Sequence, residues 1–104
     1  AESHEEAQYH ISSRARWQLF RDRGQHLTFE DPETALAAQY DEYEQSKIEE
    51  LRKTTFVGTG EEVATRITAL AKELNVEEVA IVTWAYDAIA RKNSYCQIAS
   101  AFGL

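Results

Sequence analysis

The first fifth of the chain carries apolar residues at the spacing of an amphipathic helix. They recur every four residues and would share one helix face: Ala7, Ile11, Ala15 and Leu19. Ser3, followed three residues later by Glu6, forms the capping-box pattern that starts helices. Gly24 is typical of the position just past a helix end. The pattern therefore predicts a helix from about His4 to about Arg23.

Residues 24–54 have a weaker apolar pattern and are read as an insertion that contains a helix. The stretch QHLTFE, residues 25–30, reads as a connector. Asp31 followed by Pro32 is a helix start, because proline at the first helical position loses no hydrogen bond. This helix either continues through residues 33–53 or breaks near Gln39–Asp41, where the apolar stripe weakens.

Residues 55–104 predict the order strand, helix, strand, helix. A clean apolar stripe follows Thr59 and Glu62, which form a second capping-box pattern, and consists of Val63, Ile67, Leu70 and Leu74. Next comes EEVAIVTW, a mostly β-branched run without alternation, which is typical of a strand covered on both faces. KTTFVG is a possible second, shorter strand, and a last helix is expected from about Tyr86 to about Ala101.

The apolar pattern therefore predicts a mainly α chain with one or two short strands, all within a single unit, residues 1–104. A buried strand without neighbours leaves its backbone N–H and C=O groups unpaired, which is very costly. Either the chain is a piece of a larger α/β protein, or it forms a homo-oligomer by pairing its strand with a second copy. A first residue other than methionine, Ala1, favours a trimmed chain.

Composition narrows the possible partners. With 11 basic and 18 acidic side chains the net charge is -7, which argues against a general nucleic-acid binder. No apolar run approaches the roughly 20 residues of a membrane helix, and the polar start is unlike a signal peptide. Cys96 is the single cysteine, so no internal disulfide forms, as suits a reducing compartment. We expect a cytoplasmic protein that binds neither nucleic acid nor membrane.

Few residues point to catalysis or metal binding. The three histidines lack the spacing of metal ligands, so no metal is expected: His4, His10 and His26. Cys96 is expected to be a packed thiol, because no histidine or acid adjoins it in the sequence. The glycine-containing helix start at residues 58–62 is unlike a phosphate loop, and its two glutamates oppose an anion. A run of arginines is expected to form a solvated helix face: Arg14, Arg16, Arg21 and Arg23.

The C-terminal half, FVGTGEEVATRITALAKELNVEEVAIVTWAYDAIARKNSYCQIASAF, resembles the C-terminal end of bacterial luciferase-like flavin monooxygenases. The similarity lies in a VG-(T/S)-x-E-x-V helix start, an acidic pair before a buried strand, and AR-x-x-SY in the last helix. The opening AESHEEA is similar to the family's AxTxEEA. Residues 24–53 match loosely, where the family carries a variable insertion. The most similar subgroup is formed by alkanal-monooxygenase-like proteins.

The resemblance implies that the chain is the C-terminal portion of a (β/α)₈ TIM barrel. The whole protein would oxidise an organic, alkanal-like or alkane-like substrate with O₂ and reduced flavin, either FMN or a deazaflavin. This part alone would be inactive and bind no flavin. Residues at the end of the last strand would lie near the cofactor: Thr83, Trp84 and Tyr86, with Arg91 in reach. No catalytic residue is assigned. Packing or ion pairing is the competing reading for each of these side chains.

A second reading remains open. The chain would then be a stand-alone acidic helical binding or assembly module that dimerises through its single strand. The coding sequence upstream of Ala1 distinguishes the two readings, because only the enzyme reading requires further strand–helix units there.

Overall fold

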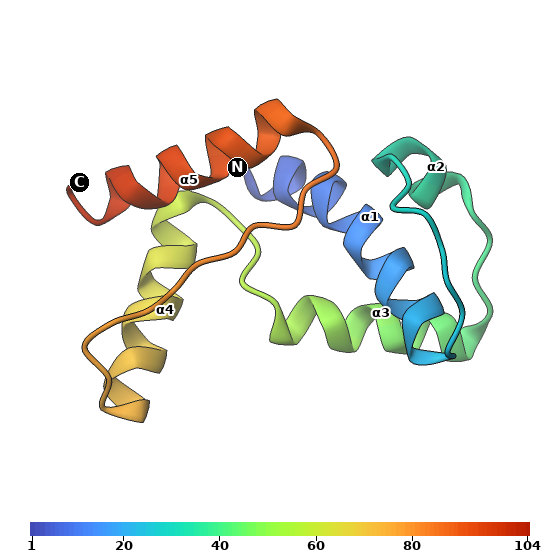
Figure 1. Cartoon of the computed structure of the whole chain (residues 1–104), viewed down its shortest axis with the longest axis horizontal. Coiled ribbons are helices and arrows are strands. Elements are labelled where there is room, and N and C mark those ends of the chain that lie inside the picture. The colour runs from blue at the N-terminus through green and yellow to red at the C-terminus, as the bar shows by residue number, and fades with distance from the viewer.

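The computed structural model describes all 104 residues and contains five α-helices and no β-strand. The helices are α1 (His4–Asp22), α2 (Pro32–Ala37), α3 (Glu42–Thr54), α4 (Gly60–Leu74) and α5 (Ala88–Ala101). Figure 1 shows them along the chain from the N-terminus to the C-terminus.

The helix starts follow the side chains that mark them in the sequence. The Ser3 hydroxyl accepts a hydrogen bond from the Glu6 N–H at 3.1 Å and begins α1. The Thr59 hydroxyl accepts one from the Glu62 N–H at 3.3 Å and begins α4. Gly24 adopts a φ of 71° after α1, a conformation that glycine takes without steric cost. These predicted boundaries are confirmed.

The helix begun at Asp31 ends early, so the predicted break is confirmed and the continuous alternative is wrong. Ala38 leaves α2 in an extended conformation. Asp41 then starts α3 with a full capping box, since Asp41 and Glu44 each accept from the other's backbone N–H. At the start of α2, a hydrogen bond from the Thr34 side chain lowers the pKa of Asp31.

The predicted strands are wrong, and so is the predicted fold class of a barrel portion with one or two strands. Residues 76–86, here called the extended segment, run without any strand pairing. The segment was expected to be covered on both faces, yet Val79 is 48% and Val82 72% exposed. A strand requires a neighbour, and KTTFVG offers none, because its first two residues end α3 and the rest forms a linker.

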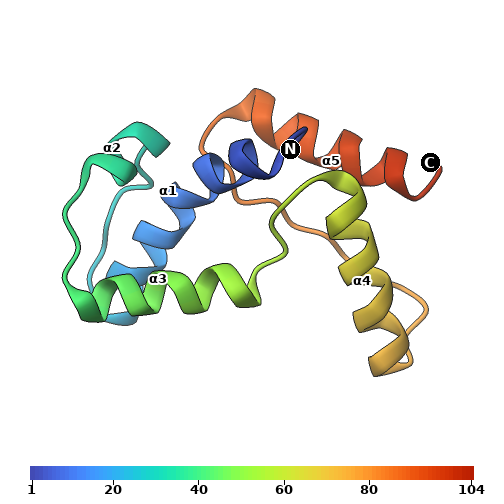
Figure 2. The same cartoon turned by 180° about the vertical axis from the view of Figure 1, so that it is seen from behind.

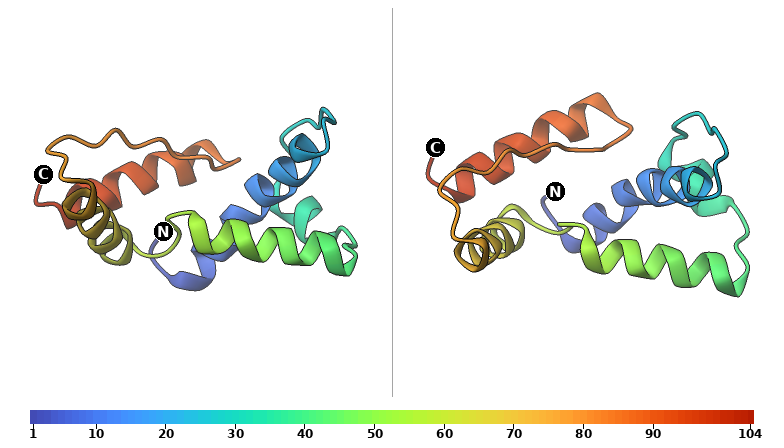
Figure 3. Two further views of the ribbon diagram at one scale, coloured as in Figure 1. Left: turned by 90° about the horizontal axis from the view of Figure 1, so that it is seen from below. Right: turned by 60° about the horizontal axis from the view of Figure 1, so that its bottom comes forward.

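The helices form two groups that the extended segment and the linker at residues 55–59 connect. α1 packs against both α2 and α3, whereas α4 packs against α5 (Figure 2). After α4 the chain turns at Asn75, which adopts a left-handed conformation with φ of 54°. The extended segment then crosses back toward the start of α5 (Figure 3).

The chain buries little of itself. Its accessible surface is 7236 Å², whereas a compact monomer of this mass exposes roughly 6,000 Å². Its radius of gyration is 14.5 Å, against about 13 Å for a compact domain of this length. The apolar stripe of α4 shows the deficit: Val63 and Ile67 are buried, but Leu70 and Leu74 are exposed. Part of the apolar stripe of α4 therefore has no packing partner within this chain.

We expect Gly60→Ala to destabilise the chain by about 1–3 kcal/mol. An added Cβ would lie 2.5 Å from the backbone oxygen of Gln97, so the substitution must push α4 away from α5. Urea unfolding measures the change in free energy. Ala69→Ser, at an exposed position on the same helix, should change stability by less than about 0.5 kcal/mol. Equal effects of the two substitutions would contradict the close packing of α4 on α5.

Candidate functional site

A cavity of about 410 Å³ lies between α1, α4, α5, the linker and the extended segment. Much of its wall is aliphatic, and the buried Val63, Ile67 and Ile98 with the half-buried Ile81 form one cluster there. Glu6, His10 and Arg14 of α1 line the cavity as well. The cavity thus combines a mostly apolar wall with a small group of titratable side chains on a single helix.

Two tryptophans join the two helix groups next to this cavity. Trp84 of the extended segment stacks on Trp17 of α1, with ring centroids 5.5 Å apart and planes inclined by 27°. The guanidinium carbon of Arg14 lies 4.3 Å from the Trp84 centroid and 4.7 Å from that of Trp17. Contacts of this kind hold a cation against aromatic faces. They therefore fix Arg14 at the boundary between α1 and the extended segment.

The environment of Arg14 disfavours its charge. Burial lowers the pKa of Arg14, the neighbouring charge of Arg21 lowers it further, and Asp22 opposes both. Its Nη1 atom is buried and has no hydrogen-bond partner, and the same is true of Nδ1 of His10. Buried polar groups are normally paired, so two unpaired nitrogens on residues of one cavity wall are unusual.

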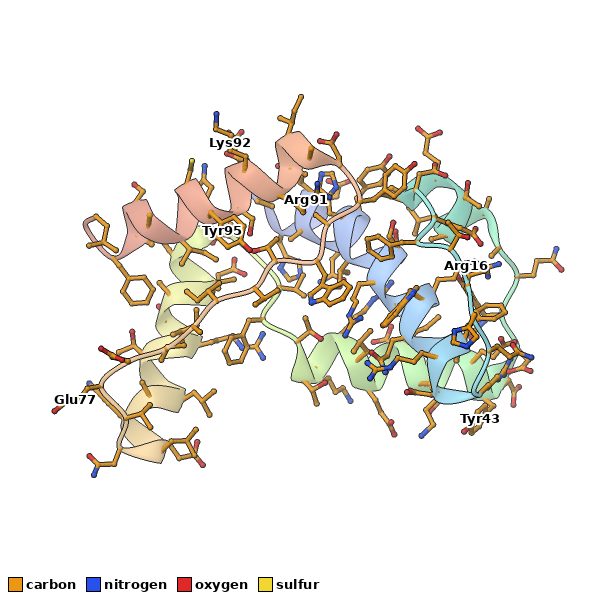
Figure 4. The ribbon with its side chains drawn as sticks, in the orientation of Figure 1. Arg16, Tyr43, Glu77, Arg91, Lys92 and Tyr95 are labelled. Atoms are coloured by element: carbon orange, nitrogen blue, oxygen red, sulfur yellow. The ribbon has the colours of Figure 1, made fainter.

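The first turns of α5 hold the carboxyl end of the extended segment. The Thr83 N–H donates to the Tyr95 hydroxyl at 3.1 Å, and the Thr83 hydroxyl lies 3.1 Å from that of Ser94. Arg91 Nη1 donates to the carbonyl oxygens of Ala85 at 2.8 Å and of Tyr86 at 3.1 Å (Figure 4). The Arg91, Ser94 and Tyr95 of the AR-x-x-SY pattern thus bind the chain's own backbone or side chain.

The four predicted site residues do not all line one cavity. Thr83 and Trp84 line the cavity, whereas Tyr86 and Arg91 do not. Tyr86 lies beside Phe29, with centroids 6.3 Å apart. Protein groups already occupy the aromatic contacts of Trp84 and the donor Nη1 of Arg91.

Sequence reasoning missed the role of α1 in this site. The arginine run splits into two kinds: Arg16 pairs with Glu30 at 3.4 Å and Arg23 with Glu44 at 3.2 Å. Nearby acids offset both charges, as the sequence predicts, but the Arg16 side chain is only 19% exposed and so does not form a solvated face. Arg14 and Arg21 instead contact the Trp17 ring. The available signal was Trp17 itself, placed between the arginines in RARWQLFR, but the sequence does not show that Trp84 completes the contact.

The remaining candidate groups add no chemistry. No three side chains of histidine, cysteine, aspartate or glutamate converge as a metal site would require. Cys96 is exposed, so the expectation of a packed thiol is wrong, because α5 buries only Ile98. No helix is both long and apolar enough to span a membrane.

We expect Arg91→Met to loosen the extended segment, because two backbone carbonyls lose their donor. Hydrogen exchange at the Thr83 N–H, the amide of residues 83–87 that is hydrogen-bonded, should become faster, by about fivefold or more for the loss of about 1 kcal/mol. Lys92→Met is the control, since Lys92 forms no ion pair or hydrogen bond and points away from the segment (Figure 4). Equal exchange in both variants would show that Arg91 does not hold the segment.

We expect Arg14→Met to leave the free energy of unfolding unchanged or to raise it. The substitution keeps an elongated side chain against the two tryptophans and removes a partly desolvated, unpaired charge. Arg16→Met, which breaks the ion pair with Glu30, should lower stability by up to about 1 kcal/mol. Thermal and urea unfolding measure both. A larger loss for Arg14→Met than for Arg16→Met would mean that the Arg14 charge stabilises the fold.

Comparison with protein-family models, with curated proteins and with solved structures found no match.

Proposed function

We propose that this chain is the C-terminal part of a luciferase-like, flavin-dependent monooxygenase and that it acts only with a flavin-binding remainder. Two features support this: the resemblance of residues 56–102 to that family, and the unpaired backbone of the extended segment. From Glu77 to Val82 no backbone group takes part in a hydrogen bond. Most of these residues are exposed, so water can reach their backbone groups, and the segment forms an open edge with which another part of a protein can pair.

The surface of the chain supports the same proposal. Large hydrophobic side chains are exposed along the extended segment and on the last turns of α4, including Val79, Val82, Leu70 and Leu74. Burying apolar surface is the main favourable contribution to protein association. A partner that covers these residues would remove the excess of exposed area over that of a compact monomer.

The cavity does not fit a flavin phosphate by itself. Arg14 and His10 offer the buried, unpaired side-chain nitrogens of its wall, and Glu6 stands 3.8 Å from Nε2 of His10. A phosphate carries up to two negative charges, and its binding requires more hydrogen-bond donors than Arg14 and His10 supply. The flavin would therefore be held by the remainder. The part proposed for this chain is to cover that site, exclude water and contribute Thr83 and Trp84 to its edge.

We expect the isolated chain to bind FMN with a Kd above about 1 μM, whereas the longer protein encoded with it binds FMN and oxidises alkanals. The assay combines reduced FMN, O₂ and decanal, and measures formation of the oxidised product with and without residues 1–104 present. Submicromolar FMN binding by the isolated chain would place the flavin site here. A coding region upstream that specifies no flavin-binding protein would overturn the proposal.

A second candidate function is supported by the exposed extended segment alone. The chain would then be an assembly module in which two copies pair through residues 77–82. Self-association without any flavin-binding remainder in the gene favours this candidate over the enzyme.

We expect the isolated chain to self-associate and Val82→Lys to weaken that association by about tenfold or more, because a charged side chain opposes edge pairing. Ile89→Lys is the matched control: Ile89 is 78% exposed, close to the 72% of Val82, but lies on α5 outside the segment. Sedimentation over a range of concentrations measures both. A wild-type chain that stays monomeric at high concentration would contradict pairing through the segment.

A further inference from the structure

We propose that the cavity between α1, α4, α5 and the extended segment binds an amphipathic carboxylate, with the carboxylate at Arg14 and the apolar tail along the aliphatic wall. The inference goes beyond the proposed function, since it requires neither flavin nor a partner. It rests on an unpaired cation, a second donor beside it, and a hydrophobic wall within one cavity.

Arg14 is singled out among the seven arginines of the chain. Five of them form ion pairs or donate hydrogen bonds to backbone carbonyls: Arg16, Arg23, Arg52, Arg66 and Arg91. Arg14 and Arg21 do neither, although acidic side chains outnumber basic ones by 18 to 11. Only Arg14 of these two lines the cavity. A buried, unpaired guanidinium nitrogen is costly, and an anion is the partner that it lacks.

The second donor limits the charge of that anion. His10 precedes Arg14 by four residues, so the two side chains share one face of α1. Nδ1 of His10 is buried and unpaired, and it donates when it carries the proton. Glu6 lies on the other side of the ring, 3.8 Å from Nε2. The Ala1 amino group, on another residue of the cavity wall, donates to the Gly58 carbonyl oxygen at 3.4 Å. On the face of α1, one guanidinium, one imidazole donor and a nearby glutamate suit a monoanion with two oxygens, such as a carboxylate, better than a dianionic phosphate.

The hydrophobic wall of the cavity indicates that the remainder of the ligand is apolar. Val63, Ile67 and Ile98 are buried with Ile81 packed against them, and all four line the cavity. An alkyl tail placed there gains about fourfold in affinity for each buried CH₂ group. A short anion such as acetate lacks this gain, and a neutral alcohol lacks the interaction with Arg14. The combination therefore selects a carboxylate with an alkyl chain.

The test is titration of the full chain with decanoate, read by tryptophan emission. The two tryptophans of the chain, Trp17 and Trp84, both contact Arg14, so a ligand at Arg14 changes their emission. We expect decanoate to bind at least about tenfold more tightly than decanol or acetate, and Arg14→Met to weaken decanoate binding by about tenfold or more. Arg16→Met, at an arginine already paired with Glu30, should bind like the wild type.

Three results would overturn the proposal. Equal affinity for decanol and decanoate would mean that the apolar wall alone binds. Inorganic phosphate competing as strongly as decanoate would mean a general anion site without use of the tail. Unchanged decanoate binding by Arg14→Met would place the carboxylate elsewhere.

A second variant keeps the test decisive if Arg14→Met fails to fold. Ile67→Ala leaves the cation in place and removes part of the tail's wall, so it should weaken decanoate binding while leaving the weak binding of acetate unchanged. Circular dichroism establishes that each variant keeps its helices. A folded Ile67→Ala chain with wild-type affinity for decanoate would equally overturn the proposed placement of the tail.

Discussion

The extended segment has backbone N–H and C=O groups that no other part of the chain pairs, and the rest of this structure depends on how the segment is held. Each helix pairs the N–H and C=O groups of its interior, and capping side chains accept from N–H groups of its first turn. Residues 77–82 form no such hydrogen bonds among themselves, and the chain supplies no neighbouring strand to pair with them. The segment is therefore held at its carboxyl end. There Trp84 stacks on Trp17, and three side chains of α5 form hydrogen bonds with the segment.

The way the segment is held also explains why the cavity exists. The segment is anchored near α5 and α1 but lacks a sheet beneath it, so it passes over the space between the two helix groups without filling it. The aliphatic side chains of α4 and α5 cover only part of that space. Arg14, held by two indole rings, stands at its edge with a nitrogen that no protein group meets.

Local signals predicted the helices well because their causes are local. The hydroxyl of Ser3, the carboxylate of Asp31 and the hydroxyl of Thr59 each bond to an N–H three residues ahead, and such contacts need no tertiary structure. The strand in EEVAIVTW was predicted from the same kind of signal but depends on a partner, which a pattern of β-branched residues does not supply. The site was predicted in part: Thr83 and Trp84 line the cavity, whereas the contribution of Arg14 depends on α1 meeting the extended segment, a contact between residues 70 positions apart.

The unpaired segment has a consequence for the behaviour of the protein in concentrated solution. Residues 79–84, VAIVTW, combine β-branched and aromatic residues with no charge and no proline, the composition of sequences that stack into cross-β aggregates. Glu77 and Glu78 stand directly before this window and Asp87 shortly after it, where like charges on stacked copies repel one another. The acidic pair before the segment thus acts as a gatekeeper, which opposes the stacking of copies through the open edge.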